Sequence, residues 1–80
     1  MSDYEWLADQ LMRSEFVENG PQLEKGECQK LLDSILESTG KTYMLIVNVN
    51  IERSGVYYDY VLAPDSECGV HIEEWDNRYL

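Results

Sequence analysis

Residues Thr42 to Leu62 read TYMLIVNVNIERSGVYYDYVL and hold the most regular pattern in the chain. Two runs of β-branched and aromatic residues flank a short turn that ends at Gly55, which is the sequence form of a β-hairpin. Strand side chains alternate between two faces. One face of the first run is therefore apolar throughout, whereas the other changes from apolar to polar at Asn48. The stretch predicts a hairpin with one face in the core, and the rest of the chain must pack on it.

The first forty residues carry the three- and four-residue apolar spacing of two amphipathic helices. The first helix is expected to start with a capping box formed by Ser2 and Glu5 and to end between Ser14 and Glu18. The second is expected over residues 22–38, with a later start near residue 27 as the alternative. The expected core residues of the second helix and the first strand are Leu31, Ile35, Val47 and Val49.

A third strand is expected over residues 70–75, after a turn-rich link at residues 63–69. Sequential strands are usually neighbours in a sheet, so an antiparallel meander is the simplest topology. We therefore expect an α+β fold in which two N-terminal helices pack on one face of a three-stranded antiparallel β-sheet, in the order ααβββ. A chain of 80 residues makes one small acidic domain over residues 1–80.

The charge balance is strongly acidic. There are 16 Asp and Glu residues against 6 Lys and Arg residues, which gives a net charge of −10. Such a chain repels phosphate backbones and anionic lipid surfaces, so we expect no direct binding of nucleic acid or membrane. A basic protein is the favoured partner, and acidity that serves only solubility is the alternative.

The two cysteines, Cys28 and Cys68, are too few for a disulfide scaffold, and no apolar N-terminal run resembles a signal peptide. We expect a reducing cytoplasm, which is the host cytoplasm if a phage encodes the chain. The single histidine, His71, follows Cys68 by three residues without a third ligand nearby, so zinc is not expected. Both thiols are expected to be small core or rim residues.

The sequence contains few groups that could catalyse a reaction. It has no phosphate-binding loop, no Gly-x-Ser-x-Gly and no His-Glu-x-x-His. His71 and Glu73 share a strand face and could act as a base and its orienting partner, but on an edge strand a solvated contact is the more common arrangement. We therefore expect a protein that is not an enzyme and has no cofactor, metal or catalytic residue.

Acidic and aromatic residues occur together along the second and third expected strands and the C-terminal tail. Tyr and Trp are enriched at interface hot spots, and carboxylates around them can imitate the phosphates that a basic groove binds. The predicted partner-binding residues are Tyr57, Asp59, Glu73, Glu74, Trp75 and Asp76. If the side chains of the two strands alternate in step in the meander, Tyr57, Asp59, Glu73 and Trp75 would share one sheet face. Glu74 would then lie on the other face, and Asp76 would lie beyond the strand end.

Two alternatives stay open for this surface. The aromatic residues could belong to the core or its rim, and the helices carry a second set of carboxylates. If the sheet surface binds the partner, Asp59 and Glu73 should be exposed residues whose charge reversal leaves the fold intact.

The segment SILESTGK at residues 34–41, followed by an apolar strand, resembles the N-terminal helix-to-strand junction of the phage uracil-DNA glycosylase inhibitor family. The chain is also similar to that family, and to small acidic phage anti-defence proteins, in its size, its acidity and its expected helices over an antiparallel sheet. A further helix follows the first strand in that family, whereas a hairpin turn follows here, so no inhibitory residue is carried over. The resemblance implies a stoichiometric inhibitor that occupies the DNA-binding groove of an enzyme.

These observations favour an acidic inhibitor that mimics DNA. Its expected partner is a basic nucleic-acid-binding protein, such as a glycosylase, a nuclease or a CRISPR-type effector, bound by a monomer or a homodimer of the chain. An immunity or antitoxin protein that neutralises a basic nuclease toxin, or a non-catalytic adaptor domain, would fit the same sequence.

Overall fold

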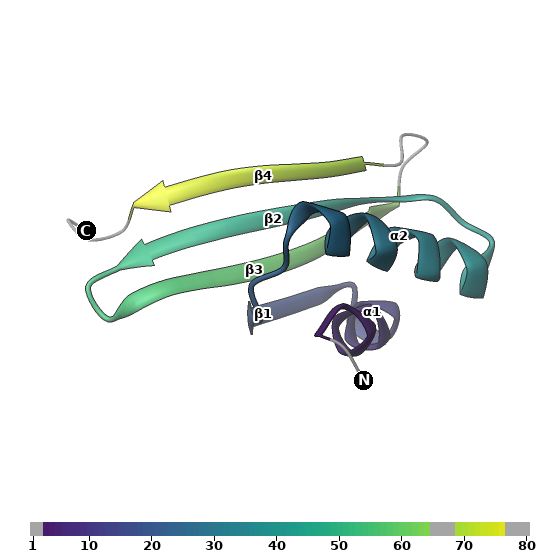
Figure 1. The fold of residues 1–80 in the computed structure, drawn as a ribbon, viewed down its shortest axis with the longest axis horizontal. Coiled ribbons are helices and arrows are strands. Elements are labelled where there is room, and N and C mark those ends of the chain that lie inside the picture. The colour runs from purple at the N-terminus through teal and green to yellow at the C-terminus, as the bar shows by residue number, and fades with distance from the viewer. Residues whose placement is uncertain (1–2, 65–68, 77–80) are drawn as a thin grey trace.

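The computed structural model describes residues 3–64 and 69–76. In these residues, two helices lie on one face of an open four-stranded sheet (Figure 1). The elements in chain order are α1 (Asp3–Ser14), β1 (Phe16–Gly20), α2 (Lys25–Thr39), β2 (Tyr43–Glu52), β3 (Gly55–Pro64) and β4 (Gly69–Asp76). The expected α+β class and the two N-terminal helices are confirmed. The expected three-stranded antiparallel sheet is wrong, because the sheet has four strands in the order β1-β3-β2-β4 and is mixed.

The β2–β3 hairpin is the centre of the sheet, as its sequence pattern predicts. The two strands pair in an unbroken antiparallel register from Tyr43 opposite Pro64 to Glu52 opposite Gly55. Gly55 takes a φ of 148°, a conformation that residues with a Cβ rarely adopt. The turn therefore favours glycine at this position.

Strand β4 pairs with β2 in a parallel arrangement, so the expected meander is wrong. Leu45 lies opposite Val70, and Val47 lies opposite Ile72. In a meander β4 would take the outer edge of β3, but β1 already occupies that edge. Strand β4 extends the sheet at the edge of β2, which is the open edge of the hairpin.

Strand β1 is the element that the sequence pattern missed. Helix α1 ends at Ser14, within the expected interval, and Glu15 takes a left-handed φ of 61° while its N–H donates to the Leu11 carbonyl at 2.7 Å. The chain reverses there, and Phe16 pairs with Val61 of β3. The residues that had been expected to end a helix therefore form a short edge strand.

The core lies between the helices and the sheet. Its buried residues are Leu7, Ala8 and Leu11 of α1, Cys28, Leu31, Leu32 and Ile35 of α2, and Leu45, Val47, Tyr60 and Leu62 of the sheet. Of the four expected core residues, Leu31, Ile35 and Val47 are confirmed, whereas Val49 is half-buried at the margin. Burial raises the pKa of the Cys28 thiol, which fits a small core residue. Cys68 and Ser2 lie outside the described residues.

Tyr60 joins the sheet to the segment that leads into α2. Its hydroxyl donates a short hydrogen bond to the Pro21 carbonyl and accepts the N–H of Leu23 at 3.2 Å. The ring lies so close to Gly20 that a Cβ built there would be 3.0 Å from it, so only glycine fits without a shift. After this segment α2 begins at Lys25, between the two expected starts, with a capping box formed by Glu24 and Glu27.

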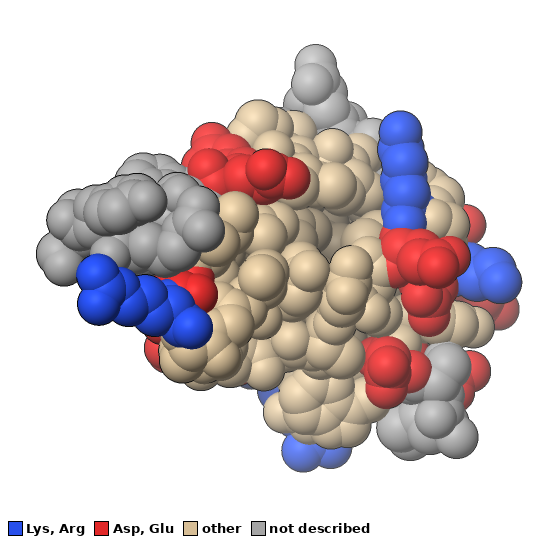
Figure 2. Space-filling model, turned by 60° about the vertical axis from the view of Figure 1, so that its left-hand side comes forward, with Lys and Arg blue, Asp and Glu red and all other residues tan. Residues whose placement is uncertain are grey.

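The hairpin extends beyond the helices. The molecule is 42 Å long and 28 Å wide, and the turn end of β2 and β3 projects past the start of α2 (Figure 1). We call residues 48–59 the hairpin arm, and Figure 2 views the molecule with this end turned toward the reader. Within the arm, Val49 and Tyr58 pack against the core. Nearer the turn, Val56 on the helix side and Glu52 on the other side are exposed, so a partner can reach both faces of the arm there.

Candidate functional site

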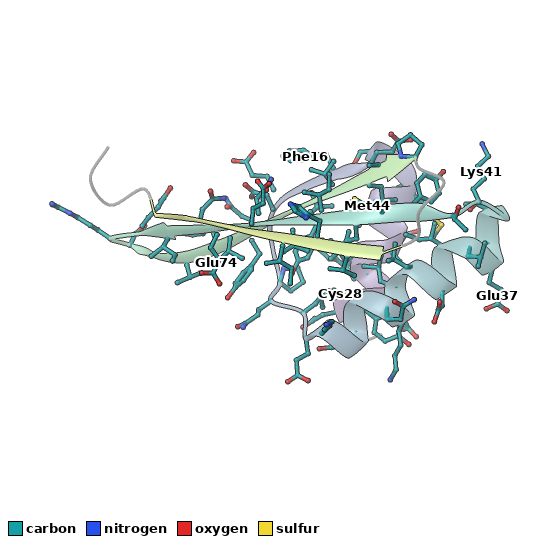
Figure 3. The ribbon with its side chains drawn as sticks, turned by 90° about the horizontal axis from the view of Figure 1, so that it is seen from above. Phe16, Cys28, Glu37, Lys41, Met44 and Glu74 are labelled. Carbon is teal, nitrogen blue, oxygen red and sulfur yellow. The ribbon has the colours of Figure 1, made fainter. Side chains whose placement is uncertain are left out.

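The sheet face that points away from the helices, here called the outer face, changes character along the strands. Figure 3 shows the sheet from its edge, with Cys28 and the helices on one side and Phe16 on the other. On β1, β2 and β3, the part of the outer face outside the arm is apolar and includes Phe16, Met44, Ile46, Val61 and Ala63, while His71 of β4 lies beside Ile46. The arm presents polar groups on the same face, namely Asn48, Asn50, Glu52, Tyr57 and Asp59. The change at Asn48 agrees with the sequence pattern.

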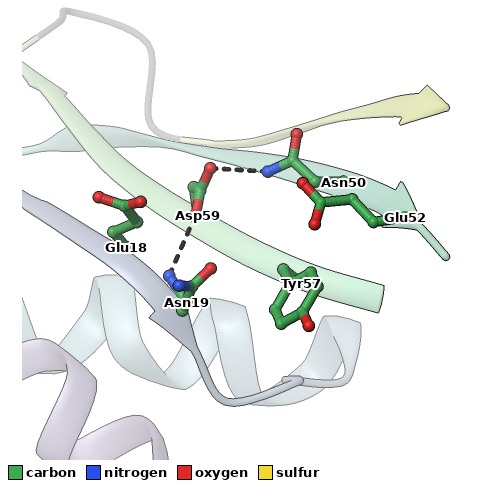
Figure 4. Close-up of a pocket in the computed structure, with 6 residues that line it drawn as sticks. All are labelled: Glu18, Asn19, Asn50, Glu52, Tyr57 and Asp59. Carbon is green, nitrogen blue, oxygen red and sulfur yellow. Dashed lines mark hydrogen bonds between the residues drawn. The ribbon is translucent and has the colours of Figure 1, made fainter. Parts of the chain in front are cut away.

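The arm and β1 together form an acidic groove with a volume of about 420 Å³ (Figure 4). It is lined by Glu18 and Asn19 of β1, Asn50 and Glu52 of β2, and Tyr57 and Asp59 of β3. Three of these six side chains are carboxylates, and none is Lys or Arg. Among the described residues, the groove therefore gathers hydrogen-bond acceptors and negative charge without a basic residue in its lining.

Asp59 is fixed at the centre of the groove by two hydrogen bonds. One carboxylate oxygen accepts the backbone N–H of Asn19 at 3.1 Å, and the other accepts the side-chain amide of Asn50 at 2.7 Å (Figure 4). A register shift in β1 and a left-handed φ of 53° at Asn19 accompany the first bond. Asparagine tolerates this conformation better than most residues.

The structure changes the interpretation of Asp59. The sequence predicts an exposed residue, but Asp59 is half-buried and holds β1 to the hairpin. The expectation that charge reversal of Asp59 leaves the fold intact assumed an exposed side chain, and that assumption is wrong. Substitution by Lys would remove both hydrogen bonds. Glu18 and Glu52 are the exposed carboxylates of the groove, and they are the better positions at which to test binding.

Tyr57 forms the wall of the groove toward the hairpin turn. Its ring is half-buried, and its hydroxyl lies 2.8 Å from the hydroxyl of Ser54 in a hydrogen bond. An aromatic ring held beside carboxylates offers apolar contact to the stem of an Arg or Lys side chain. Tyr57 and Asp59 of the predicted surface therefore do lie together.

Glu73 and Glu74 occupy opposite faces of β4. Glu73 shares the outer face with Asp59, as the sequence predicts, but Asn48 of β2 lies between the two in the register. The Glu73 carboxylate lies 3.0 Å from Nε2 of His71, and both side chains are exposed, which fits a solvated surface pair. Glu74 points to the helix side, beyond the start of α2 (Figure 3).

The last two predicted residues belong to the end of β4. Trp75 is in register with Asn50, and Asp76 is in register with Ile51 as the final residue of the strand. The expectation that Asp76 lies beyond the strand is therefore wrong. The side chains of Trp75 and Asp76 lie outside the described part of the structure, so the outer-face position predicted for Trp75 stays a prediction.

Sequence reasoning missed four groove residues. Asn50 and Glu52 lie on the same face of the hairpin as Tyr57 and Asp59, and Asn50 is directly opposite Tyr57. The alternation of side chains along the two strands could therefore have identified both residues. Glu18 and Asn19 could not be found in this way because they come from β1, whose pairing with β3 has no local signal.

The described residues contain no group of three or more His, Cys, Asp or Glu side chains arranged to hold a metal ion. In the same residues, no helix is long and apolar enough to cross a membrane. Comparisons of the chain with models of protein families, with curated proteins and with solved structures found no match. The chemistry of the groove must therefore be read from its own residues, and an open, carboxylate-lined groove suits guanidinium and ammonium groups.

Proposed function

We propose that the protein is an acidic, non-catalytic inhibitor that mimics DNA and occupies the nucleic-acid-binding surface of a DNA-handling or defence enzyme. The observation that carries the proposal is the groove between β1 and the projecting arm, which places Glu18, Glu52 and Asp59 beside Tyr57. A protein surface that binds DNA presents Lys and Arg side chains to phosphate oxygens. The groove offers the same kind of acceptor to those side chains.

The fixed position of Asp59 supports this use of the groove. A carboxylate that is already oriented loses little side-chain freedom when a partner binds, so more of the contact energy contributes to affinity. The two exposed carboxylates at Glu18 and Glu52 extend the negative charge on either side. The net charge of −10 adds long-range attraction for a basic surface and accelerates encounter.

The test begins with capture of the partner. The full chain, immobilised on a resin, is exposed to a bacterial lysate, and the retained protein is identified by mass spectrometry and purified. We expect a basic nucleic-acid-binding protein whose Kd for the chain rises at least about ten-fold between low and physiological salt, since salt screens exposed charges. A partner whose affinity is the same at both salt concentrations would contradict the proposal and favour an adaptor that binds through apolar contacts.

A further inference from the structure

The hairpin arm has a second exposed face, on the helix side of the sheet, and this face is apolar. We call it the apolar arm face, and it consists of Val49, Ile51, Val56 and Tyr58 together with Ile72 of β4. Val56 and Ile72 are 50% and 54% exposed. Both lie on the helix side of the sheet, the same face that forms the core where the helices cover it. Figure 2 shows a broad region without charged side chains between the hairpin end and α2, with carboxylates and Lys or Arg side chains at its borders.

The contrast between the two faces of the arm indicates that the apolar one is covered in use. On the outer face, β2 becomes polar at Asn48, as expected for a strand that faces water. On the helix side the same strand stays apolar through Ile51, beyond the point where helix α2 begins. A contiguous exposed apolar surface with a polar border is typical of a protein interaction site.

Charge decides which occupant fits. A second copy of the chain would bring together two molecules of net charge −10, and an anionic membrane would repel the chain for the same reason. Five side chains, three of them half-buried, also expose much less than the roughly 800 Å² per partner of a standard interface. A dimer through this face alone would therefore be weak.

Carboxylates and Lys or Arg side chains both lie at the borders of the apolar arm face (Figure 2). Glu74 lies on the same side of β4, two residues from Ile72, and is exposed. Tyr60 follows Tyr58 on the same strand face and is hydrogen-bonded to Leu23 in the segment before α2, which closes the apolar arm face toward the core. Because the chain has a net charge of −10, an occupant with apolar groups at its centre and basic groups around them is favoured over an acidic one.

We propose that the apolar arm face binds an amphipathic, basic segment of a protein. Its apolar stripe would pack on Val56, Ile51 and Ile72, and its Lys and Arg side chains would face Glu74, with the net charge of −10 adding long-range attraction. The site lies on the opposite side of the sheet from the acidic groove, so it does not depend on DNA mimicry.

A model peptide tests this site directly. The probe is a synthetic peptide of about 14 residues that contains only Leu and Lys, with Leu at helical spacing so that one face is apolar. Titrated into the isotopically labelled full chain, it should shift the amide NMR signals of Val49, Ile51, Val56, Tyr58 and Ile72 more than those of Glu18, Asn19 and Glu52. A scrambled peptide of the same composition should bind at least about ten-fold more weakly, because it lacks the apolar stripe.

Matched variants complete the test. The double substitution Val56→Thr and Ile72→Thr keeps the β-branched shape that strands favour and should weaken binding at least about ten-fold, since two apolar contacts are lost. Leu36→Gln, at a residue that is 40% exposed in α2 away from the arm, should change the Kd less than about two-fold. Thermal melting checks that the variants fold, and Val56→Thr alone replaces the double variant if it does not.

Two kinds of outcome would overturn the proposal. Equal binding of the scrambled peptide, or of the Thr variant, would mean that charge alone attracts the probe. Signal shifts confined to the groove residues would place the peptide on the outer face instead. Neither outcome would affect the proposed mimicry, which the Glu18 and Glu52 substitutions described below address.

Discussion

The double variant Glu18→Lys and Glu52→Lys is expected to bind the captured partner at least about a hundred-fold more weakly than the wild-type chain at low salt. Both residues are exposed in the groove lining, and the hydrogen bonds that fix Asp59 come from Asn19 and Asn50. The fold should therefore be kept, while the charge that meets the partner is inverted. Isothermal titration calorimetry measures the loss, which should shrink as salt is added.

A variant with the same change in net charge is the control. Asp33→Lys and Glu37→Lys alter two exposed carboxylates of α2, and Glu37 lies at the end of the molecule opposite the hairpin turn (Figure 3). This variant should lose only the long-range attraction, about ten-fold or less. If it loses as much affinity as the groove variant, the partner contacts the helical carboxylates and the groove is not the site.

The stability of the protein is expected to fall by about 2–3 kcal/mol between pH 10 and pH 12 through Tyr60 alone. Burial of the hydroxyl raises the pKa of Tyr60 from its ordinary value near 10 to about 12. In that interval the unfolded chain loses the tyrosine proton and the folded chain keeps it. Stability from this group is therefore fully present below pH 10 and is lost as the pH rises toward 12. Urea unfolding followed by circular dichroism at pH 9 and above pH 11 measures the loss.

Two phenylalanine variants show whether Tyr60 is responsible. Tyr60→Phe should cost about 1–3 kcal/mol of stability at neutral pH, because the Pro21 carbonyl and the Leu23 N–H lose their partner. The variant should also lack the fall in stability between pH 10 and pH 12 that Tyr60 causes. Tyr43→Phe keeps the Tyr60 hydroxyl and should retain that share. An identical alkaline loss in wild type and Tyr60→Phe would show that the hydroxyl of Tyr60 is not the titrating group.

The sequence predicts those parts of the fold whose pattern is long and local. The hairpin and both helices follow from apolar periods that continue over ten or more residues. Strand β1 has only five residues, and Asn19, Gly20 and Pro21 together are typical of a turn. It becomes a strand because β3 offers an open edge and because Asp59 accepts the Asn19 N–H, and neither contact has a local signal.

The neighbour of a strand is harder to predict than its faces. Alternation in β4 correctly separates Glu73 from Glu74, but it contains no information on whether β4 pairs with β2 or β3. That choice depends on β1, which takes the edge of β3. The sequence therefore brings Tyr57 and Asp59 together, since both belong to one hairpin, but it does not bring Glu18 and Asn19 to them, since these belong to a strand without a local signal.

Displacement of DNA from the partner is the measurement that tests the proposed mimicry most directly. Fluorescently labelled duplex DNA is bound to the captured partner, the chain is titrated in, and the anisotropy of the DNA is followed. We predict that the anisotropy falls to the value of free DNA as the chain saturates the partner, and that the Glu18→Lys and Glu52→Lys variant requires at least about a hundred-fold higher concentration. A complex in which the partner holds the chain and the DNA together, with the affinity for each unchanged by the other, would contradict mimicry.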